Sequence, residues 1–316
     1  MAKLVSEITL GIDVSKDELV ICNWDTNELT TLANQDSTIK TWLKSSYGPL
    51  RIAIEPTSSY HLEMVEQAHA LGFAVYLINP RQLAHYRKAV GERNKTDPAD
   101  ARLLARYLAH ESASLRPFKP QSAKAQRLWA LIKRRGVVVA ARQKLQQSFR
   151  DIKLPAKALF TEIQKVIARI DQQIQALITE LGWRADYHHC LSIPGIGPAN
   201  SAALTAVFHR GAFAGSDAYV AFIGLDIRVR ESGKFKGQRK LTKCGEAEIR
   251  RLLYCAAQAA RSYQPFDDYL QLQLAKGLSR IASKTILARK LARIAFTLLT
   301  NKQSFKKQQI AYSISP

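Results

Sequence analysis

The stretch that decides the fold is ITLGIDVSKDELVICNW, residues 8–24. Two short apolar runs rich in β-branched residues are separated by only a few polar ones, which predicts a hairpin of two strands. In the first strand, alternation places Gly11 and Asp13 on the face opposite to Leu10 and Ile12. A carboxylate inside such a strand is costly unless it is paired or bound to a metal.

The chain continues with the same kinds of element up to about residue 113. Three strands followed by alternating strands and helices predict an α/β domain with a mixed sheet. No glycine-rich phosphate loop follows the first strand, which disfavours a dinucleotide-binding fold. The further strands are expected over 28–33, 51–56 and 73–80, and the helices over 39–47, 62–72, 81–90 and 98–113.

Basic residues are distributed unevenly along the 316 residues, whose formal net charge is +21. The first 120 residues hold 14 basic and 14 acidic side chains, so the entire excess lies in residues 121–316. This predicts a neutral N-terminal domain and a cationic region that favours a polyanionic partner such as nucleic acid. The four cysteines form no CxxC pair, which excludes a zinc ribbon. With no signal peptide or membrane span expected, we expect a cytoplasmic protein.

Four carboxylates of the first domain are candidate metal ligands. Asp13 and Glu55 each follow a small residue at i−2, which leaves room beside them, although both are also explained as solvated strand ends. Asp97 and Asp100 share one face at the start of an expected helix, although an N-cap at Asp97 and the helix dipole at Asp100 explain them too. If the four converge, their hard oxygen atoms select Mg²⁺ or Mn²⁺ and fit phosphodiester chemistry.

Residues 120–182 carry apolar side chains at helical spacing on both sides of Pro155. This predicts an antiparallel helical hairpin or a coiled coil that binds a partner, with a helical linker packed on its own domain as the alternative. One stripe comprises Ile163, Val166, Ile167, Ile170, Ile174 and Leu177.

The last part of the chain opens with PGIGP, residues 194–198, between two apolar segments. It is similar to the turn of a helix-hairpin-helix unit, in which Gly195 and Gly197 let backbone amides approach a nucleic-acid phosphate. A purely structural turn between helices is the alternative. A basic loop over 227–245 and helices over 246–263 and 283–299 follow.

Seven basic residues of that loop are candidate phosphate contacts, with a solvated loop as the alternative. They are Arg228, Arg230, Lys234, Lys236, Arg239, Lys240 and Lys243. A second cluster near the C-terminus is a candidate for binding RNA or DNA and comprises Arg289, Lys290, Arg293, Lys302, Lys306 and Lys307.

Five segments resemble, in this order, the DEDD-type insertion-sequence transposases known as bridge-RNA-guided recombinases, to which the pilin-gene invertases are related. They are GIDVSKDELVI, AIEPTSSYH, INPRQLAHYRKAVGERNKTDPADARLLARY, LSIPGIGPANSAALTAV and RESGKFKGQRKLTKCGEAEIRRLLY. The resemblance covers nearly the whole chain. Its most specific parts are the NPRQ…KTDxxDA block and the pairing of PGIG with ESG.

This resemblance implies a RuvC-like domain with an RNase-H-like sheet over 1–115, a helical coiled coil or linker over 116–183, and a mainly α-helical transposase domain over 184–316. Such proteins act as dimers that assemble into tetramers. A noncoding bridge RNA pairs with donor and target DNA.

The resemblance also assigns the chemistry. It places the serine nucleophile of the E-S-G motif at Ser232, which by itself reads as a turn residue. Attack by this hydroxyl would give a phosphoserine link to DNA that conserves bond energy for rejoining. Lys234, Phe235 and Lys236 follow where small polar residues are typical of the family, which leaves the local DNA contacts open. The implied metal ligands are Asp13, Glu55, Asp97 and Asp100.

The sequence therefore predicts a magnesium-dependent DNA transposase that acts through Ser232. A site-specific invertase of the same chemistry is the second hypothesis. The third is a RuvC-like resolvase or nuclease that uses activated water, for which Ser232 is dispensable. The fourth is a nucleic-acid-binding protein without catalysis.

Overall fold

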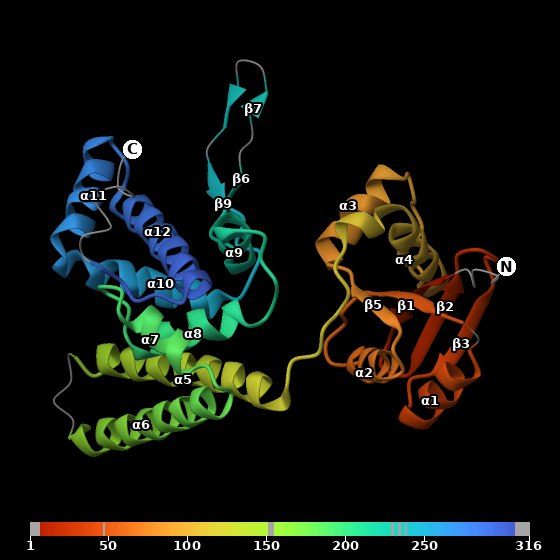
Figure 1. The fold of residues 1–316 in the computed structure, drawn as a ribbon, viewed down its shortest axis with the longest axis horizontal. Helices are drawn as coiled ribbons and strands as arrows, with labels where there is room; N and C mark the ends of the chain where they lie inside the picture. The colour runs from red at the N-terminus through yellow and green to blue at the C-terminus, as the bar shows by residue number, and fades with distance from the viewer. Residues whose placement is uncertain are drawn as a thin grey trace. The chain divides into compact units, whose positions relative to one another are not determined.

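The computed structural model describes residues 7–46, 48–150, 155–228, 231–232, 235–237 and 239–306. The chain divides into two compact units, residues 1–120 and 121–316. The first is an α/β unit and the second is mainly helical (Figure 1). The domain boundaries at 115/116 and 183/184 stay predictions.

The first unit is built on a five-stranded sheet with the order β3-β2-β1-β4-β5. The hairpin of β1 and β2 is antiparallel, whereas β1 pairs with β4, and β4 with β5, in parallel. The mixed sheet predicted from the sequence is thus confirmed. Its strands are β1 (Ile8–Val14), β2 (Glu18–Asn23), β3 (Leu29–Ala33), β4 (Leu50–Ile54) and β5 (Ala74–Leu77).

Helices cover both faces of this sheet. Because side chains alternate along β1, each residue of this strand packs against the helices on one face or the other. Leu10 and Ile12 lie in one core cluster with Ile39 of α1 (Asp36–Ser45) and Met64 of α2 (Leu62–Ala70). The opposite face packs against α3 (Pro80–Ala89) and α4 (Asp97–Glu111), which is followed by a short 3₁₀ turn over Ser112–Ser114. Gly11 and Asp13 therefore belong to the face that α4 covers.

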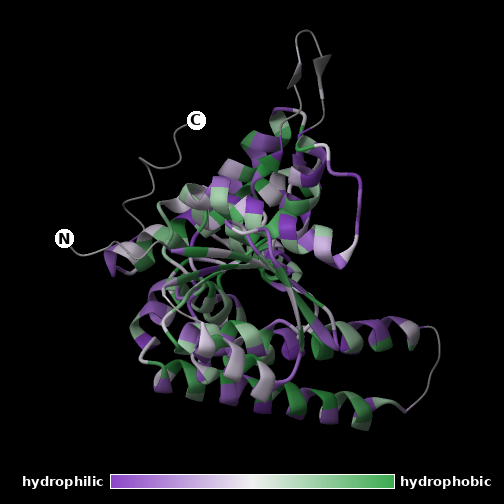
Figure 2. Cartoon of the chain, turned by 90° about the vertical axis from the view of Figure 1, so that its right-hand side faces the viewer, coloured by the Kyte–Doolittle hydropathy of each residue, from purple (hydrophilic) through white to green (hydrophobic). Residues whose placement is uncertain are grey.

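The second unit begins with two long antiparallel helices, α5 (Ala123–Ser148) and α6 (Lys157–Glu180). Ion pairs link Lys124 with Glu180 and Arg135 with Asp171 across the hairpin. Figure 2 shows hydrophobic and hydrophilic residues interspersed along both helices. Leu128, Trp129 and Ile132 of α5 and Ile174 and Leu177 of α6 belong to the core of the whole unit. The helical hairpin is confirmed, and a coiled coil with a partner stays a prediction.

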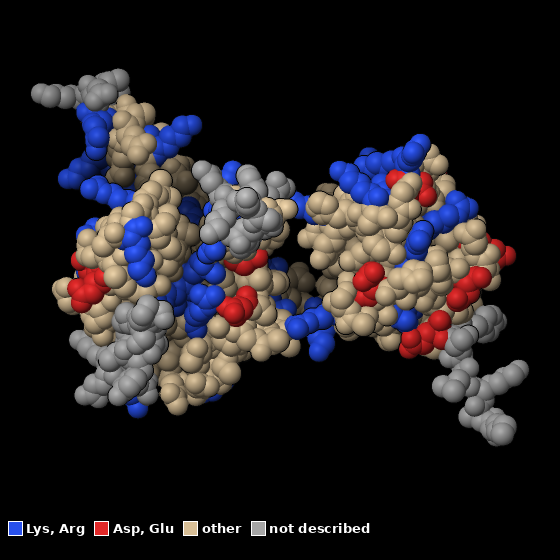
Figure 3. Space-filling view, turned by 90° about the horizontal axis from the view of Figure 1, so that it is seen from above, with Lys and Arg blue, Asp and Glu red and all other residues tan. Residues whose placement is uncertain are grey.

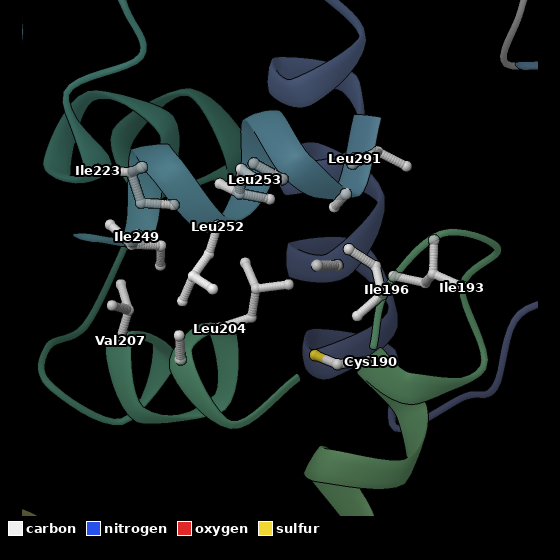
Figure 4. Close-up of a cluster of buried hydrophobic side chains, with 14 of the residues drawn as sticks. Cys190, Ile193, Ile196, Leu204, Val207, Ile223, Ile249, Leu252, Leu253 and Leu291 are labelled. Carbon is white, nitrogen blue, oxygen red and sulfur yellow. The ribbon is translucent and has the colours of Figure 1, made fainter. Parts of the chain in front are cut away.

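Among the described residues of the second unit, six further helices pack around one apolar cluster (Figure 4). Leu287, Leu291 and Ala295, all fully buried, place the last helix in the middle of this cluster. These helices are α7 (Arg184–Leu191), α8 (Pro198–Phe208), α9 (Ser216–Ile223), α10 (Ala247–Ala259), α11 (Gln264–Ala275) and α12 (Arg280–Asn301), with a 3₁₀ turn over Ala260–Ser262. Within the part of the chain that the structure describes, no helix is both long and apolar enough to cross a membrane.

Candidate active site

Two of the four predicted carboxylates lie on neighbouring parallel strands. In the β1–β4 register Ile12 is the partner of Ile54, so the next residues along each strand, Asp13 and Glu55, lie at the same end of the sheet. Both side chains are half-buried. The sequence placed both acids on strands, with solvated strand ends as the alternative, and the parallel pairing is what makes them neighbours.

Gly11 explains how a helix reaches Asp13. A Cβ atom added to Gly11 would collide with the backbone of Ala101 and Ala105, because α4 lies directly on β1 at this point. Ala101 follows Asp100, so this close approach carries the start of α4 toward the end of β1 that holds Asp13. The small residue two positions before Asp13 thus makes room for a helix backbone.

The start of α4 differs by one residue from the expectation. Thr96, not Asp97, is the N-cap, and its side chain accepts a hydrogen bond from the backbone N–H of Ala99. Asp97 is the first helical residue and is exposed, whereas Asp100 is only 8% exposed. Since Thr96 supplies the cap, Asp97 is not needed for it, although both acids still favour the helix dipole.

The four carboxylates interact electrostatically. Burial, followed by the charges of Asp100, Asp97 and Glu55, raises the pKa of Asp13 to about 6. Burial and Asp100 also raise the pKa of Glu55, while Lys95 and Arg87 oppose that shift. A set of hard oxygen donors that repel one another in a partly desolvated site has the chemistry that suits a divalent cation.

Arg87 of α3 contacts one of the four acids, and the sequence analysis did not single it out. Its Nη2 lies 2.6 Å from Oδ1 of Asp100, and its Nη1 donates to the backbone oxygen of Asn94. Among the described residues, no three His, Cys, Asp or Glu side chains lie close enough together to hold a metal ion. The ion pair with Asp100 places the positive charge of Arg87 beside the acidic cluster, by which we mean Asp13, Glu55, Asp97 and Asp100. An arginine on the helix just before the acidic block was the available signal.

Ser232 lies in the second unit, on a narrow β-ribbon that the sequence showed only as a basic loop. Two short antiparallel pairs form the ribbon: β6 (Ile227–Arg228) with β9 (Lys240–Leu241), and β7 (Glu231–Ser232) with β8 (Phe235–Lys236). Ser232 pairs with Phe235 and is exposed. Figure 1 shows the ribbon projecting from α9, with β7 farther out than β6.

The base of the ribbon is fixed by contacts from the helical body. Nη1 of Arg250 in α10 donates to the backbone oxygens of Ile223, at 3.2 Å, and Gly245, at 2.7 Å, which flank the ribbon on both sides. The hydroxyl of Thr242 donates to Asp226, and the Thr242 N–H donates to the Asp226 backbone oxygen. Arg250 was not predicted, because its role depends on a helix that follows the loop.

The predicted phosphate-contacting residues are only partly described. Arg228, Arg239, Lys240 and Lys243 are exposed along the ribbon and at its base, which suits contact with phosphates. For Lys236 the structure describes the backbone only. Arg230 and Lys234 lie outside the described residues. The seven-residue cluster stays a prediction.

The PGIGP segment joins α7 to α8, as expected for a turn between helices. Gly195 has φ 86°, and a Cβ there would lie 2.6 Å from the Cα of Ala260. Ile193 and Ile196 are buried in the apolar cluster (Figure 4). Gly197 is the N-cap of α8, and a Cβ there would meet nothing within 4 Å. Close packing against Ala260 is enough to explain a glycine at position 195, whereas the space beside Gly197 is open. Contact of either glycine with nucleic acid stays a prediction.

Comparison with known proteins adds four matches, two to family models and two to relatives. Residues 10–152 match a DEDD-type family model described as a transposase, and residues 187–271 match one described as the transposase IS116/IS110/IS902 family. The pilin gene-inverting proteins of Moraxella lacunata and Moraxella bovis are each 26% identical to the chain over 323 residues. These alignments cover 96% of this chain and 99% of each relative.

Proposed function

The chain belongs to the IS116/IS110/IS902 family of transposases, and from this premise we propose that it cuts and rejoins DNA through a covalent link to Ser232. It is an enzyme that acts on DNA. The observation that carries the proposal is the exposure of Ser232 on a β-ribbon with basic residues, in a chain whose other unit holds four carboxylates, three of which raise the pKa of the fourth, Asp13.

In the proposed step, the Oγ atom of Ser232 attacks the phosphorus of one DNA phosphodiester. The bond from Oγ to phosphorus forms, and the bond from phosphorus to the leaving sugar oxygen breaks. The hydroxyl proton passes to a carboxylate, and the leaving oxygen takes up a proton. Rejoining reverses the step, with a new DNA hydroxyl displacing Ser232, so that no ATP is needed.

The acidic cluster has the proposed role of holding the divalent metal that a DEDD transposase domain suggests. Bound Mg²⁺ or Mn²⁺ would polarise the attacked phosphate and offset the charge that develops on it. Arg87 would hold the Asp100 carboxylate in place beside this site through their 2.6 Å ion pair. The residues with the donor chemistry to hold the metal are Asp13, Glu55, Asp97 and Asp100.

A trapping assay tests the proposal. The protein is incubated with Mg²⁺ and DNA that carries the element's junction, with and without RNA from its flank, and covalent protein–DNA adducts are separated under denaturing conditions. We expect an adduct from the parent chain and from the control Ser262→Ala, whose serine is exposed in the same unit. We expect none from Ser232→Ala or Asp13→Asn. Cleavage that persists in Ser232→Ala without an adduct would establish a nuclease that uses water.

A second candidate function is inversion of a single chromosomal segment, favoured by the two relatives named as pilin gene-inverting proteins. An invertase should recombine two inverted sites on one DNA molecule without RNA from an element's flank. A transposase guided by a bridge RNA should require that RNA. Plasmids that carry each arrangement, assayed with and without the RNA, separate the two.

We also propose a homo-oligomeric complex with the bridge RNA, in which acids and Ser232 from different subunits meet, as the family resemblance implies. The cationic second part of the chain supports binding to nucleic acid, since the whole excess charge lies in residues 121–316. Sedimentation with and without RNA tests this, and a monomer under every condition would overturn it.

A further inference from the structure

A pocket of about 550 Å³ lies in the second unit. Tyr269 of α11, the central turns of α12, Ser216 at the start of α9, and Phe305 and Lys306 after α12 line it. We call it the α12 pocket. Its size is in the range of cavities that bind small ligands.

The polar side of the α12 pocket is cationic. Arg289, Lys290, Arg293 and Lys306 line it. Arg293 is paired with Asp217, with Nη2 2.6 Å from Oδ1. By contrast, Nε of Arg289 is buried without a hydrogen-bond partner.

A partly buried arginine whose Nε lacks a hydrogen-bond partner, such as Arg289, favours an anionic ligand. Burial lowers the pKa of Arg289, and the nearby charge of Arg293 lowers it further, while Asp217 and Asp226 oppose the shift. Burial likewise lowers the pKa of Lys290. A buried cation that is incompletely paired costs free energy, and an anionic ligand beside the Arg289 guanidinium would offset that cost.

The remaining wall of the α12 pocket is apolar and aromatic. Ile286, Ile294, Leu298 and Phe305 contribute to it. Nζ of Lys290 lies 4.4 Å from the ring centroid of Tyr269, so this ring stabilises the charge of Lys290 by a cation–π interaction. A ligand that matches both walls therefore carries negative charge at one end and a flat or apolar group at the other.

The geometry points to a binding site for one unpaired nucleotide of a single-stranded nucleic acid, with its phosphate at Arg289 and its sugar or base against the apolar wall. A recess of this kind suits an unpaired nucleotide, because a paired base stays stacked inside its duplex. Figure 3 shows Lys and Arg side chains on the visible face of the second unit, and such positive charge favours binding to the phosphates of a nucleic acid. This inference extends the proposed function, since strand exchange exposes unpaired nucleotides.

Equilibrium binding tests the inference without any strand cleavage. Fluorescence anisotropy is measured with a labelled single-stranded DNA, a single-stranded RNA of the same sequence, and the blunt duplex. The test variant is Arg289→Gln. The matched control is Arg280→Gln, which removes an equal charge from an exposed position at the start of the same helix. Thermal unfolding of each variant verifies that it is folded.

We expect Arg289→Gln to weaken binding of at least one single strand about tenfold relative to Arg280→Gln, because a charge-assisted hydrogen bond is lost. The slope of log affinity against log salt should become shallower by about 0.7, the share of one single-strand phosphate. Duplex affinity should be equal in the two variants. Equal single-strand affinities, or an equal loss for the duplex, would overturn the inference. Because this binding experiment needs no covalent adduct, its result can be interpreted even if Ser232 forms no link to DNA.

Discussion

The acidic cluster and the serine ribbon are positioned in opposite ways. Asp13 and Glu55 sit at the ends of paired central strands, and the close contact at Gly11 fixes the helix that carries Asp100. Ser232 sits in a two-residue strand of a ribbon whose described anchors lie at its base. The acids thus depend on a packed core, whereas the serine depends on a few hydrogen bonds. Substitutions that disturb the packing around the acids should therefore lower the stability of the first unit, whereas substitutions at the base of the ribbon should mainly slow adduct formation.

The largest expected effect comes from Gly11→Val. Its side chain would collide with the backbone of α4, which cannot move without separating from β1, so the first unit should lose about 4 kcal/mol or more. Urea unfolding measures this. Gly215→Ala is the control, because a Cβ there meets nothing within 4 Å and its φ of 177° is extended backbone. Similar stability of the two variants would show that α4 tolerates displacement.

The next largest effect concerns the buried carboxylate of Asp186 in the helical unit, which pairs with the exposed Lys302 and with the partly buried side chain of His209. Nζ of Lys302 lies 2.8 Å from Oδ1 of Asp186, and Nε2 of His209 lies 2.8 Å from Oδ2. Burial raises the pKa of Asp186, but hydrogen bonds from Lys302 and His209 outweigh it and leave this pKa lowered. Asp186→Asn should cost about 3 kcal/mol at neutral pH, because Lys302 and His209 lose their acceptor.

The pH dependence of this pair has a definite sign. Since the pKa of Asp186 is lowered in the folded state, its stabilisation is present above the unfolded pKa and is lost as the pH falls through the folded one. Burial also lowers the pKa of His209, despite the opposing effect of Asp186, so protonation below its unfolded pKa disfavours folding as well. The melting temperature of the parent should fall on acidification, and Asp186→Asn should flatten the acidic part of that fall. An unchanged slope would contradict the assignment.

A smaller effect is expected for Arg87→Gln at the acidic cluster. Without metal, the loss of the pair with Asp100 should lower stability by about 2 kcal/mol, since both side chains are mostly buried. Mg²⁺ should then raise the melting temperature of this variant more than that of the parent, because a competing cation is absent. Calorimetry with and without Mg²⁺ measures both. The control is Arg81→Gln on the same helix. An equal response to Mg²⁺ in Arg87→Gln and the parent would argue against a metal at these acids.

The smallest effect on stability is expected for Arg250→Gln, at about 1 kcal/mol for hydrogen bonds to Ile223 and Gly245. The rate of adduct formation should nevertheless fall about tenfold, because the base of the serine ribbon is less constrained. Arg251→Gln is the control, since the neighbouring Arg251 pairs with Glu248 on its own helix. Equal adduct rates in the two variants would show that Arg250 has no positioning role.

Local sequence pattern was sufficient for much of this molecule. Alternation in residues 8–24 determined the first hairpin, the face of Gly11 and the position of Asp13, because side chains on a strand alternate strictly. The prolines and glycines determined where several strands and helices end, for example at Gly72, which has φ 85° after α2. The charge of residues 121–316 and the family resemblance pointed to DNA.

Only the tertiary structure decided which distant residues become neighbours. The parallel register brings Glu55 beside Asp13, and α3 brings Arg87 to Asp100, because long-range pairing follows from packing of the whole core. The same packing turned a basic loop into the ribbon of Ser232 and moved the N-cap of α4 to Thr96. The α12 pocket likewise exists because three helices leave space between them, which no local pattern encodes.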